Sequence, residues 1–388
     1  MLVVYNGKIV TNSKVIQGKI LIIKDDKIAD IQDEKKLFNY RDEKLIDAKG
    51  GYILPGLIDI HSDIIKKIIV PRKGLVFDYT LALMQVDRML INQGITTVYH
   101  ALSFADSTVF NQNSTLSISN MAGIAVAINK TPKLLINHKF HARLELSSVN
   151  AVEILLEMMQ NNEVHELSFM NHAPGQGQYT DVESFKREVA IRNAGISEKE
   201  KNEIVQICQS KRKITDDRIQ ELINLANEKC IPMAYHDVSE IEKLSWMEKN
   251  NIKICEFPLN LKVAKEAINK KLYSVCGCPN ILNKKSHNNN LSAIDGILQG
   301  GINIISSDYF PYGLLYSVFQ LIFDYHVPIE KAVLLVTLNP AKALNISNMY
   351  GSISIGKYAD VIVVECINGL PVVKYVVKAG VLVSAIGK

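Results

Sequence analysis

Residues 55–63 read Pro-Gly-Leu-Ile-Asp-Ile-His-Ser-Asp and follow the apolar run Tyr52-Ile53-Leu54. Aliphatic and β-branched residues favour a buried strand here. Because side chains at i and i+2 of a strand point to the same face, His61 and Asp63 would project side by side from its carboxyl end. Imidazole and carboxylate groups are ligands of divalent metal ions. Taken alone, the segment allows either a metal site or a strand that ends in a polar turn.

The composition is that of a globular enzyme-sized chain. Of its 388 residues, 47% are hydrophobic and 22% are charged, which supports a large core. The net charge of +4 is spread along the sequence, so no basic arm for nucleic acid is indicated. No segment has the roughly 18 apolar residues of a membrane span, no signal peptide is indicated, and the six cysteines form no disulfide framework. These features predict a cytoplasmic protein that binds neither nucleic acid nor membrane. They are compatible with a homo-oligomer.

The middle of the chain alternates between strand-like and helix-like stretches. Strands are expected at 53–60, 95–102, 133–146, 165–171, 231–236, 253–257, 273–278 and 302–307. Helices are expected at about 79–93, 113–128, 148–160, 200–229, 238–250, 261–270, 291–298 and 313–345. Eight strands that alternate with helices predict a parallel (β/α)8 barrel. An open doubly wound sheet is the alternative, but no glycine-rich phosphate loop follows the first strand.

Both ends of the chain are rich in short strand-like segments. The first strand, at residues 2–5, runs into Asn6-Gly7, which is a hairpin turn signal. Neither terminal piece is large enough to be stable by itself. We therefore predict that residues 1–52 and 350–388 form one β-sandwich, and that residues 53–349 form the barrel. The predicted fold class is α/β, a distorted TIM barrel with a flanking β-sandwich made from both chain ends.

One connection interrupts the alternation. Residues 173–200 begin with the polar, turn-rich run from Ala173 to Tyr179, and no helix is expected before residue 200. A long connection at the carboxyl end of a barrel strand is more often functional than incidental. We expect a lid or substrate loop here, with a solvated excursion as the alternative.

Polar residues follow six of the eight predicted strands, at the end where a barrel holds its site. The predicted metal ligands are His61, Asp63, Glu145, His172, His236 and Asp308. One or two divalent ions would lower the pKa of a bound water and polarise the bond under attack. Glu145 would bridge two ions, and Asp308 would also be the catalytic general base. This ligand set fits Zn, Mn or Fe better than Mg or Ca.

Several longer segments resemble the amidohydrolase superfamily. Residues 54–61 are similar to its first-strand signature, residues 94–98 to its second strand, and residues 338–344 and 351–361 to its C-terminal closure. The resemblance implies a distorted TIM barrel, a flanking β-sandwich and a metal-activated water. A carboxylated lysine bridges the metals in part of that superfamily, and Glu145 is expected to take its place here.

Within the superfamily, the chain is most similar to the diphosphatases of the carbon–phosphorus lyase pathway. The similar motifs lie at residues 61–63, 70–74, 141–145, 172–178, 236–237, 256–258, 279–280, 286–290 and 307–309. The resemblance implies release of diphosphate from α-D-ribose 1-methylphosphonate 5-triphosphate in phosphonate metabolism. Candidate contacts to this small anionic substrate are Arg72, Arg143, Gln176, Lys284, Lys285, Ser286 and His287. Ile64 and the pair Lys284-Lys285 depart from the family pattern and leave the exact anionic substrate open.

Two other functions remain as alternatives. Hydrolysis of a C–N bond by a deacetylase, cyclic amidase or deaminase needs the same ligands but less positive charge at the site. A non-catalytic barrel would have lost metal ligands, whereas the set of candidates here is complete.

Overall fold

Eight parallel strands form the centre of the molecule. The structure is a computed structural model that describes residues 1–72, 74–105, 116–177, 179, 181–193, 195–284 and 290–387. The sheet has the order β15-β14-β13-β12-β11-β10-β9-β8. Its strands are β8 (Leu57–Ser62), β9 (Ile95–Phe104), β10 (Asn137–Glu145), β11 (Glu166–Met170), β12 (Met233–His236), β13 (Ile254–Glu256), β14 (Tyr273–Gly277) and β15 (Ile304–Ser306). Two backbone hydrogen bonds bring its edges together, from Asp308 N–H to the His61 carbonyl (2.9 Å) and from Asp63 N–H to the Asp308 carbonyl (2.7 Å). The predicted TIM barrel is confirmed in this nearly closed form.

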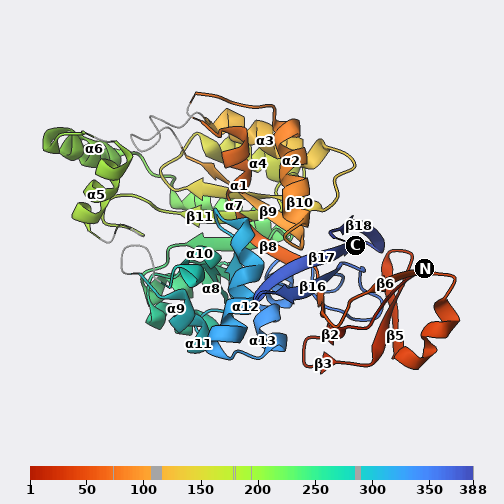
Figure 1. Ribbon diagram of the computed structural model, residues 1–388. Coiled ribbons are helices and arrows are strands. Elements are labelled where there is room, and N and C mark those ends of the chain that lie inside the picture. The colour runs from red at the N-terminus through yellow and green to blue at the C-terminus, as the bar shows by residue number, and fades with distance from the viewer. Residues whose placement is uncertain are drawn as a thin grey trace.

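Helices surround the barrel (Figure 1). They are α1 (Ile64–Ile69), α2 (Tyr79–Ile91), α3 (Ile118–Lys130), α4 (Ala151–Gln160), α7 (Asp216–Glu228), α8 (Ile241–Lys249), α9 (Leu261–Asn269), α10 (Cys278–Leu282), α11 (Ala293–Leu298), α12 (Leu314–Tyr325), α13 (Ile329–Leu334) and α14 (Leu338–Ala343). The single helix expected at 313–345 is divided, because His326 takes a left-handed conformation (φ 56°) and Pro328 caps α13. The helix expected at 200–229 is also divided, by residues 211–215.

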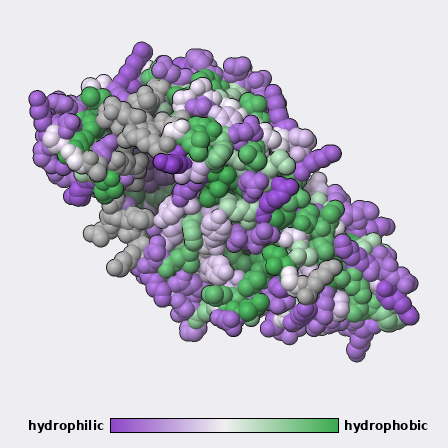
Figure 2. Space-filling view, turned by 45° about the horizontal axis from the view of Figure 1, so that its top comes forward, coloured by the Kyte–Doolittle hydropathy of each residue, from purple (hydrophilic) through white to green (hydrophobic). Residues whose placement is uncertain are grey.

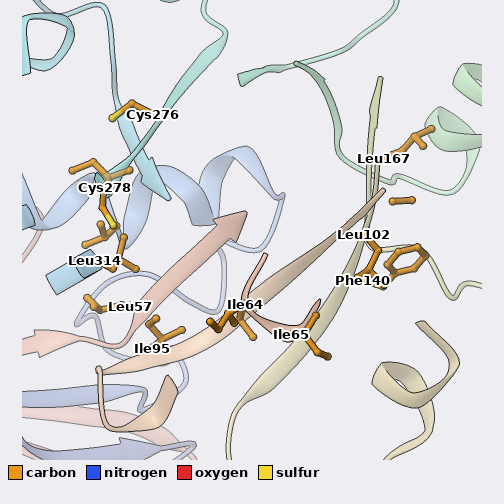
Figure 3. Close-up of a cluster of buried hydrophobic side chains, with 14 of the residues drawn as sticks. Leu57, Ile64, Ile65, Ile95, Leu102, Phe140, Leu167, Cys276, Cys278 and Leu314 are labelled. Atoms are coloured by element: carbon orange, nitrogen blue, oxygen red, sulfur yellow. The ribbon is translucent and has the colours of Figure 1, made fainter. Parts of the chain in front are cut away.

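The main hydrophobic core lies between the outer face of the barrel and these helices. Leu57, Leu102, Phe140 and Leu167 are fully buried and come from four adjacent strands. Figure 3 shows them in one cluster with residues of α1 and α12. Each such side chain stabilises the fold by about 1.5–3 kcal/mol relative to an exposed position. This apolar layer fixes the strands whose carboxyl ends carry the polar residues.

Both chain ends contribute to a β-sandwich beside the barrel. One sheet has the order β5-β4-β1-β6 and the other β18-β17-β16-β7-β2-β3. Their strands are β1 (Leu2–Tyr5), β2 (Lys8–Val10), β3 (Val15–Ile16), β4 (Lys19–Lys24), β5 (Lys27–Asp33), β6 (Lys44–Asp47), β7 (Tyr52–Pro55), β16 (Val361–Ile367), β17 (Leu370–Lys378) and β18 (Val381–Ala385), with a 3-10 helix at Glu34–Tyr40. Leu21 and Ile23 of one sheet share a buried cluster with Ile53 and Val361 of the other. Figure 1 places both termini in this part of the molecule.

Two expectations about the N-terminal half are wrong. Residues 53–60 are not one strand, because β7 pairs with β16 in the sandwich while β8 belongs to the barrel. The chain changes sheets at Gly56, where an added Cβ would lie 2.3 Å from Thr96 Oγ1. Asn6-Gly7 does not form a hairpin either. It leads from β1, which pairs with β4 and β6, to β2 in the other sheet.

The segment at 173–200 contains a helix that the sequence interpretation missed. Helix α5 (Val182–Arg192) and helix α6 (Glu198–Ser210) form a hairpin that projects from the barrel at the left of Figure 1. Phe185, Val189, Ile204 and Val205 give it a small core of its own. Its start was readable from capping, since Asp181 accepts a hydrogen bond from the Ser184 N–H. The connection is therefore a folded arm rather than an irregular loop.

The molecular surface viewed in Figure 2 is hydrophilic over most of its area, with smaller hydrophobic patches between the polar regions. Within the part of the chain that the structure describes, no helix has the length and apolar character needed to cross a membrane.

Candidate metal centre

A single cavity of about 910 Å³ brings the predicted ligands together. It is lined by His61, Asp63, Glu145, His172, His236 and Asp308. These residues stand at or just after the carboxyl ends of β8, β10, β11, β12 and β15. Because the barrel strands are parallel, their carboxyl ends meet at one end of the barrel and bring together residues from distant parts of the sequence.

The backbone at this end of the barrel is strained at three non-glycine residues. Asp237, Phe257 and Asp308 have φ values of 57°, 51° and 55° and follow β12, β13 and β15. A left-handed conformation costs an L-residue roughly 1–2 kcal/mol. Each is held by a 2.9 Å backbone hydrogen bond from its own N–H to a neighbouring strand end. Strain that the surrounding structure maintains in this way is concentrated at functional sites.

Glu256 orients His61. The Nδ1 atom of His61 lies 2.7 Å from Glu256 Oε1, and both side chains are buried. Burial lowers the pKa of His61 despite the nearby carboxylate, which favours the neutral imidazole that a metal requires. Burial alone would raise the pKa of Glu256, but His61 and His141 bring it to about 2. With Nδ1–H donating to Glu256, the Nε2 atom of His61 is left as the ligand atom.

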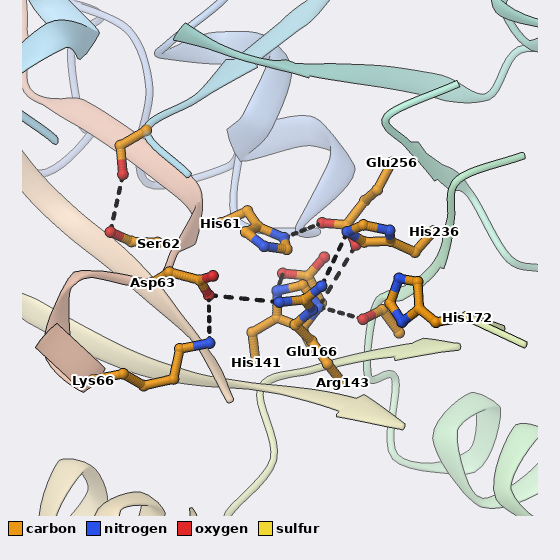
Figure 4. Close-up of polar contacts among 12 residues, drawn as sticks. His61, Ser62, Asp63, Lys66, His141, Arg143, Glu166, His172, His236 and Glu256 are labelled. Atoms are coloured by element: carbon orange, nitrogen blue, oxygen red, sulfur yellow. Dashed lines mark hydrogen bonds and ion pairs between the residues drawn. The ribbon is translucent and has the colours of Figure 1, made fainter. Parts of the chain in front are cut away.

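Asp63 and Asp308 form a candidate metal-binding group with His61. Figure 4 shows Asp63 between Lys66 and Arg143, at 2.8 and 3.5 Å. Although burial alone would raise it, the pKa of Asp63 is held well below its usual range by these two cations. Burial and the charge of Asp63 raise the pKa of Asp308 to about 7. One carboxylate is thus ionised while its neighbour is suited to exchange a proton near neutral pH.

A second candidate group consists of His172, His236 and Asp237. Asp237 Oδ2 lies 3.2 Å from His172 Nε2 and 2.9 Å from His236 Nδ1. Glu145 Oε2 lies 2.8 Å from His172 Nδ1. Burial by itself would lower the pKa of His172, but its bonds to Asp237 and Glu145 raise it to about 9. Glu145, predicted as a bridging ligand, therefore contacts His172 here. Asp237 was missed as a candidate ligand although it directly follows His236.

A third group lies deeper and consists of His141, Glu166 and Glu256. Glu166 Oε2 lies 3.5 Å from His141 Nδ1, and all three side chains are fully buried. Burial and the charge of Glu256 raise the pKa of Glu166 well above its usual value. Glu166 opens β11 rather than closing it. The rule that places site residues at strand ends therefore gave no signal for it.

The donor set of the site fits a divalent cation. Within the described part of the chain, Glu166 Oε1 and Glu256 Oε2 are buried and form no hydrogen bond. Buried polar atoms are rarely left without a partner in native proteins. Imidazole nitrogens and carboxylate oxygens together match the preferences of transition-metal ions such as Zn²⁺.

The predicted substrate contacts separate into three sets. Arg143 lines the cavity, and its Nη2 atom lies 3.1 Å from His236 Nε2. Arg72, Gln176 and Lys284 are exposed and do not line it, and Lys284 forms an ion pair with Asp324 at 3.3 Å. The predicted contacts Lys285, Ser286 and His287 lie outside the described residues. Three lysines that were not predicted do line the cavity: Lys66, Lys211 and Lys213.

Comparison with known families agrees with this architecture. The Amidohydrolase family model matches residues 52–383, and the chain belongs to this family. It is therefore a hydrolase of the metal-dependent amidohydrolase type. The chain is 27% identical over 370 residues to the alpha-D-ribose 1-methylphosphonate 5-triphosphate diphosphatase of Escherichia coli (strain K12), covering 93% of this chain and 94% of that protein. A shorter match, 30% identical over 67 residues, is to the 5-methylthioadenosine/S-adenosylhomocysteine deaminase of Bacillus thuringiensis (strain Al Hakam). It covers 16% of this chain and 15% of the deaminase.

Solved structures show the same fold. Molinate hydrolase superposes with a TM-score of 0.70 at 13% identity, over 98% of this chain and 94% of that one. Enamidase has a TM-score of 0.64 at 15% identity, over 99% and 96%. N-acetylglucosamine-6-phosphate deacetylase from Pasteurella multocida has a TM-score of 0.64 at 13% identity, over 99% of both chains. At these identities the likeness concerns the fold.

Proposed function

We propose that this protein is a cytoplasmic diphosphatase that releases diphosphate from α-D-ribose 1-methylphosphonate 5-triphosphate in phosphonate catabolism. The observation that carries the proposal is the placement of Arg143 beside Asp63 and Asp308 within one cavity. This puts a fixed cation next to a carboxylate with a pKa of about 7. The similarity to the Escherichia coli diphosphatase over 94% of that protein supports the same substrate.

The proposed cofactor is one or two ions of Zn, Mn or Fe. His61, Asp63, His236 and Asp308 would hold it, with His172 and Asp237 as the ligands of a second ion, whose binding would release the proton that the raised pKa keeps on His172. When bound, such an ion lowers the pKa of a coordinated water and polarises the bond under attack. Glu256 and Glu145 keep His61 and His172 in fixed orientations through the short contacts described above.

The remaining steps fall to side chains of the chain itself. An Asp308 carboxylate oxygen accepts a proton from the attacking water, and its pKa of about 7 suits this role near neutral pH. The water oxygen bonds to the phosphorus nearest the ribose, the bond from that phosphorus to the bridging oxygen breaks, and diphosphate leaves. Arg143 remains charged throughout and attracts the phosphoryl oxygens through its planar donors.

Hydrolysis of a C–N bond is the second candidate. The short match to a deaminase and the fold shared with a deacetylase favour it. Such substrates need a polarised carbonyl or amidine but little positive charge around it. The cavity is lined by Lys66, Arg143, Lys211 and Lys213. The cavity also contains carboxylates, several of them candidate metal ligands, and the four cations beside them favour a phosphorylated substrate.

The deciding experiment measures diphosphate release from α-D-ribose 1-methylphosphonate 5-triphosphate by protein loaded with Zn, Mn or Fe. Asp308→Asn should lower kcat by roughly 10²–10⁴-fold, the usual contribution of a general base. Asp324→Asn, on the exposed ion pair with Lys284, is the matched control and should leave kcat unchanged. Bound metal is measured in all three proteins. Ammonia or amine release from C–N substrates, with no diphosphate from wild type, would reject the proposal in favour of the second candidate.

A further inference from the structure

The connection between α6 and α7 carries three consecutive cations, and two of them line the cavity. Lys211 and Lys213 are lining residues, whereas Arg212 between them does not line the cavity, although Lys213 and Arg212 are both exposed. The backbone is extended at Lys211 (φ −59°, ψ 135°), beyond the end of α6. The cavity is thus lined by the first and third of these consecutive cations and not by the second.

The barrel fixes the position of this segment. Ile214 is buried, and its backbone N–H donates to the Leu146 carbonyl at 2.9 Å, directly after β10. Lys213 directly precedes Ile214, and α7 begins two residues after Ile214, at Asp216. The lysines therefore project from a segment attached to the same strand that carries Arg143 and Glu145.

The two lysines differ from the other cations of the cavity in their partners. Lys66 and Arg143 both contact Asp63, at 2.8 and 3.5 Å. Among the residues that the structure describes, no carboxylate oxygen lies within 4.0 Å of the ammonium nitrogen of Lys211 or Lys213. Lys211 lies close enough to Cys208, another lining residue, to oppose the rise in thiol pKa that burial causes there. Their charges are thus directed at the cavity without being neutralised by a neighbouring carboxylate.

An ammonium group presents a compact charge with three N–H donors, which suits phosphoryl oxygens whose number and geometry vary. We propose that Lys211 and Lys213 form a subsite for the terminal phosphoryl groups of a polyphosphate substrate. The inference rests on the proposed function, since it takes the substrate to be a triphosphate. It assigns the leaving diphosphate to the α6–α7 connection and the reacting phosphorus to the region of Asp63, Arg143 and Asp308. Substrates with one phosphate would gain little from this subsite.

The test is a calorimetric titration of the full-length, metal-loaded protein with inorganic tripolyphosphate. We expect the Lys211→Ala/Lys213→Ala double variant to bind it at least tenfold more weakly than wild type. Arg212→Ala removes the same kind of charge from the same segment at a residue that does not line the cavity, and its affinity should stay within twofold of wild type. Inorganic phosphate is titrated in parallel and should show a much smaller difference. Metal content is measured afterwards, because tripolyphosphate itself chelates metals.

Unchanged tripolyphosphate affinity in the double variant would overturn the subsite. An equal loss of affinity in Arg212→Ala would also overturn the subsite, because the loss would then reflect the overall positive charge of the segment and not contacts made by the two lysines. Diphosphate release separates this inference from the proposed function. Turnover by wild type with an unchanged KM in the double variant rejects the subsite alone. Lysine-dependent tripolyphosphate binding without any diphosphate release rejects the proposed substrate and leaves the subsite standing.

Discussion

His61 Nδ1 and Glu256 Oε1 lie 2.7 Å apart although the two residues are 195 positions apart in the sequence. His61 belongs to β8 and Glu256 closes β13, so the contact joins distant strands across the barrel interior. Both side chains are buried, and the bond determines which ring nitrogen of His61 carries the proton. A metal ligand oriented by a buried carboxylate is a common arrangement in metalloenzymes.

The first prediction concerns Glu256. Glu256→Gln should weaken metal binding by about 10–100-fold, the usual cost of altering a group that orients a ligand. The measurement is equilibrium dialysis against Zn²⁺ and Mn²⁺. Glu248→Gln, in a partly exposed ion pair with Lys270, serves as the control and should bind metal as wild type does. Wild-type affinity in Glu256→Gln would show that the contact stabilises the fold without orienting a ligand.

The second prediction concerns removal of the metal. Chelation should abolish turnover, and addition of one of Zn²⁺, Mn²⁺ or Fe²⁺ should restore it. The same addition should raise the free energy of unfolding, by about 2.7 kcal/mol at a metal concentration 100 times the Kd. Thermal denaturation with and without each ion measures this shift. Full turnover by protein shown to be free of metal would contradict the assignment of the centre.

The third prediction concerns Arg143. Arg143→Lys keeps a charge but loses the planar donors that match a phosphoryl group. We expect its KM for the triphosphate substrate to rise roughly 10–100-fold, which corresponds to the 1.5–3 kcal/mol of a charge-assisted hydrogen bond. Metal content should be unchanged. Arg88→Lys, on the exposed face of α2, is the control. A loss of metal in Arg143→Lys, with unchanged KM, would place Arg143 in the metal centre rather than on the substrate.

The sequence predicted the fold well where the periodicity is strong. The strands that end at Glu145 and His236 and the strand that precedes Asp308 were all found, since each apolar run ends in a polar residue, whereas the strand predicted at 53–60 is divided between two sheets. Local turn chemistry was less reliable. Gly56 separates two sheets because a side chain there would collide with Thr96, and no periodicity reveals a contact with a residue 40 positions away.

The structure also contains site residues that sequence reasoning could not assign. Glu166 lies at the beginning of its strand, and the parallel register of β10 and β11 pairs it with His141. Lys211 and Lys213 follow a helix rather than a strand, and their approach to the cavity depends on the backbone bond of Ile214 to Leu146. The sequence shows three consecutive basic residues, Lys211, Arg212 and Lys213. The tertiary contacts that bring two of them to the cavity are not encoded in the local pattern.

The fourth prediction concerns stability at acidic pH. His165 Nδ1 accepts a hydrogen bond from the Phe140 N–H at 3.2 Å, so protonation would break this bond. Burial, followed by the charge of Lys139, lowers the pKa of His165 from 6.5 to about 4. The unfolded chain therefore binds the proton first, and the contribution of His165 is complete above pH 6.5. It is lost as the pH falls toward 4, at most about 1.4 kcal/mol per pH unit.

Chemical denaturation between pH 7 and 4 measures this effect. His165→Asn supplies a carbonyl oxygen that can accept the Phe140 N–H but does not titrate, so its free energy of unfolding should fall less steeply. His326→Asn is the control, because His326 is exposed and asparagine tolerates its left-handed backbone. Equal slopes in His165→Asn and wild type would show that other groups cause the acid sensitivity.

The fifth prediction concerns a buried network outside the cavity. Asp87 of α2 accepts hydrogen bonds from the backbone N–H groups of Leu135 and Ile136 at 3.0–3.1 Å, and it contacts His138 Nε2 at 3.0 Å. His138 in turn lies 2.8 Å from His100. These bonds tie α2 to the segment that enters β10, the strand that carries Arg143 and Glu145.

Asp87→Ala should lower the free energy of unfolding by roughly 3 kcal/mol or more, because several buried donors lose their acceptor at once. Asp324→Ala removes an exposed carboxylate whose ion pair with Lys284 has both partners about half exposed. Such a pair contributes about 0–1 kcal/mol, so this control should unfold almost as wild type does. Urea denaturation of the three proteins at pH 7 gives the comparison. A loss in Asp87→Ala no larger than in the control would mean that water replaces the carboxylate, and that the position of β10 depends on its apolar contacts alone.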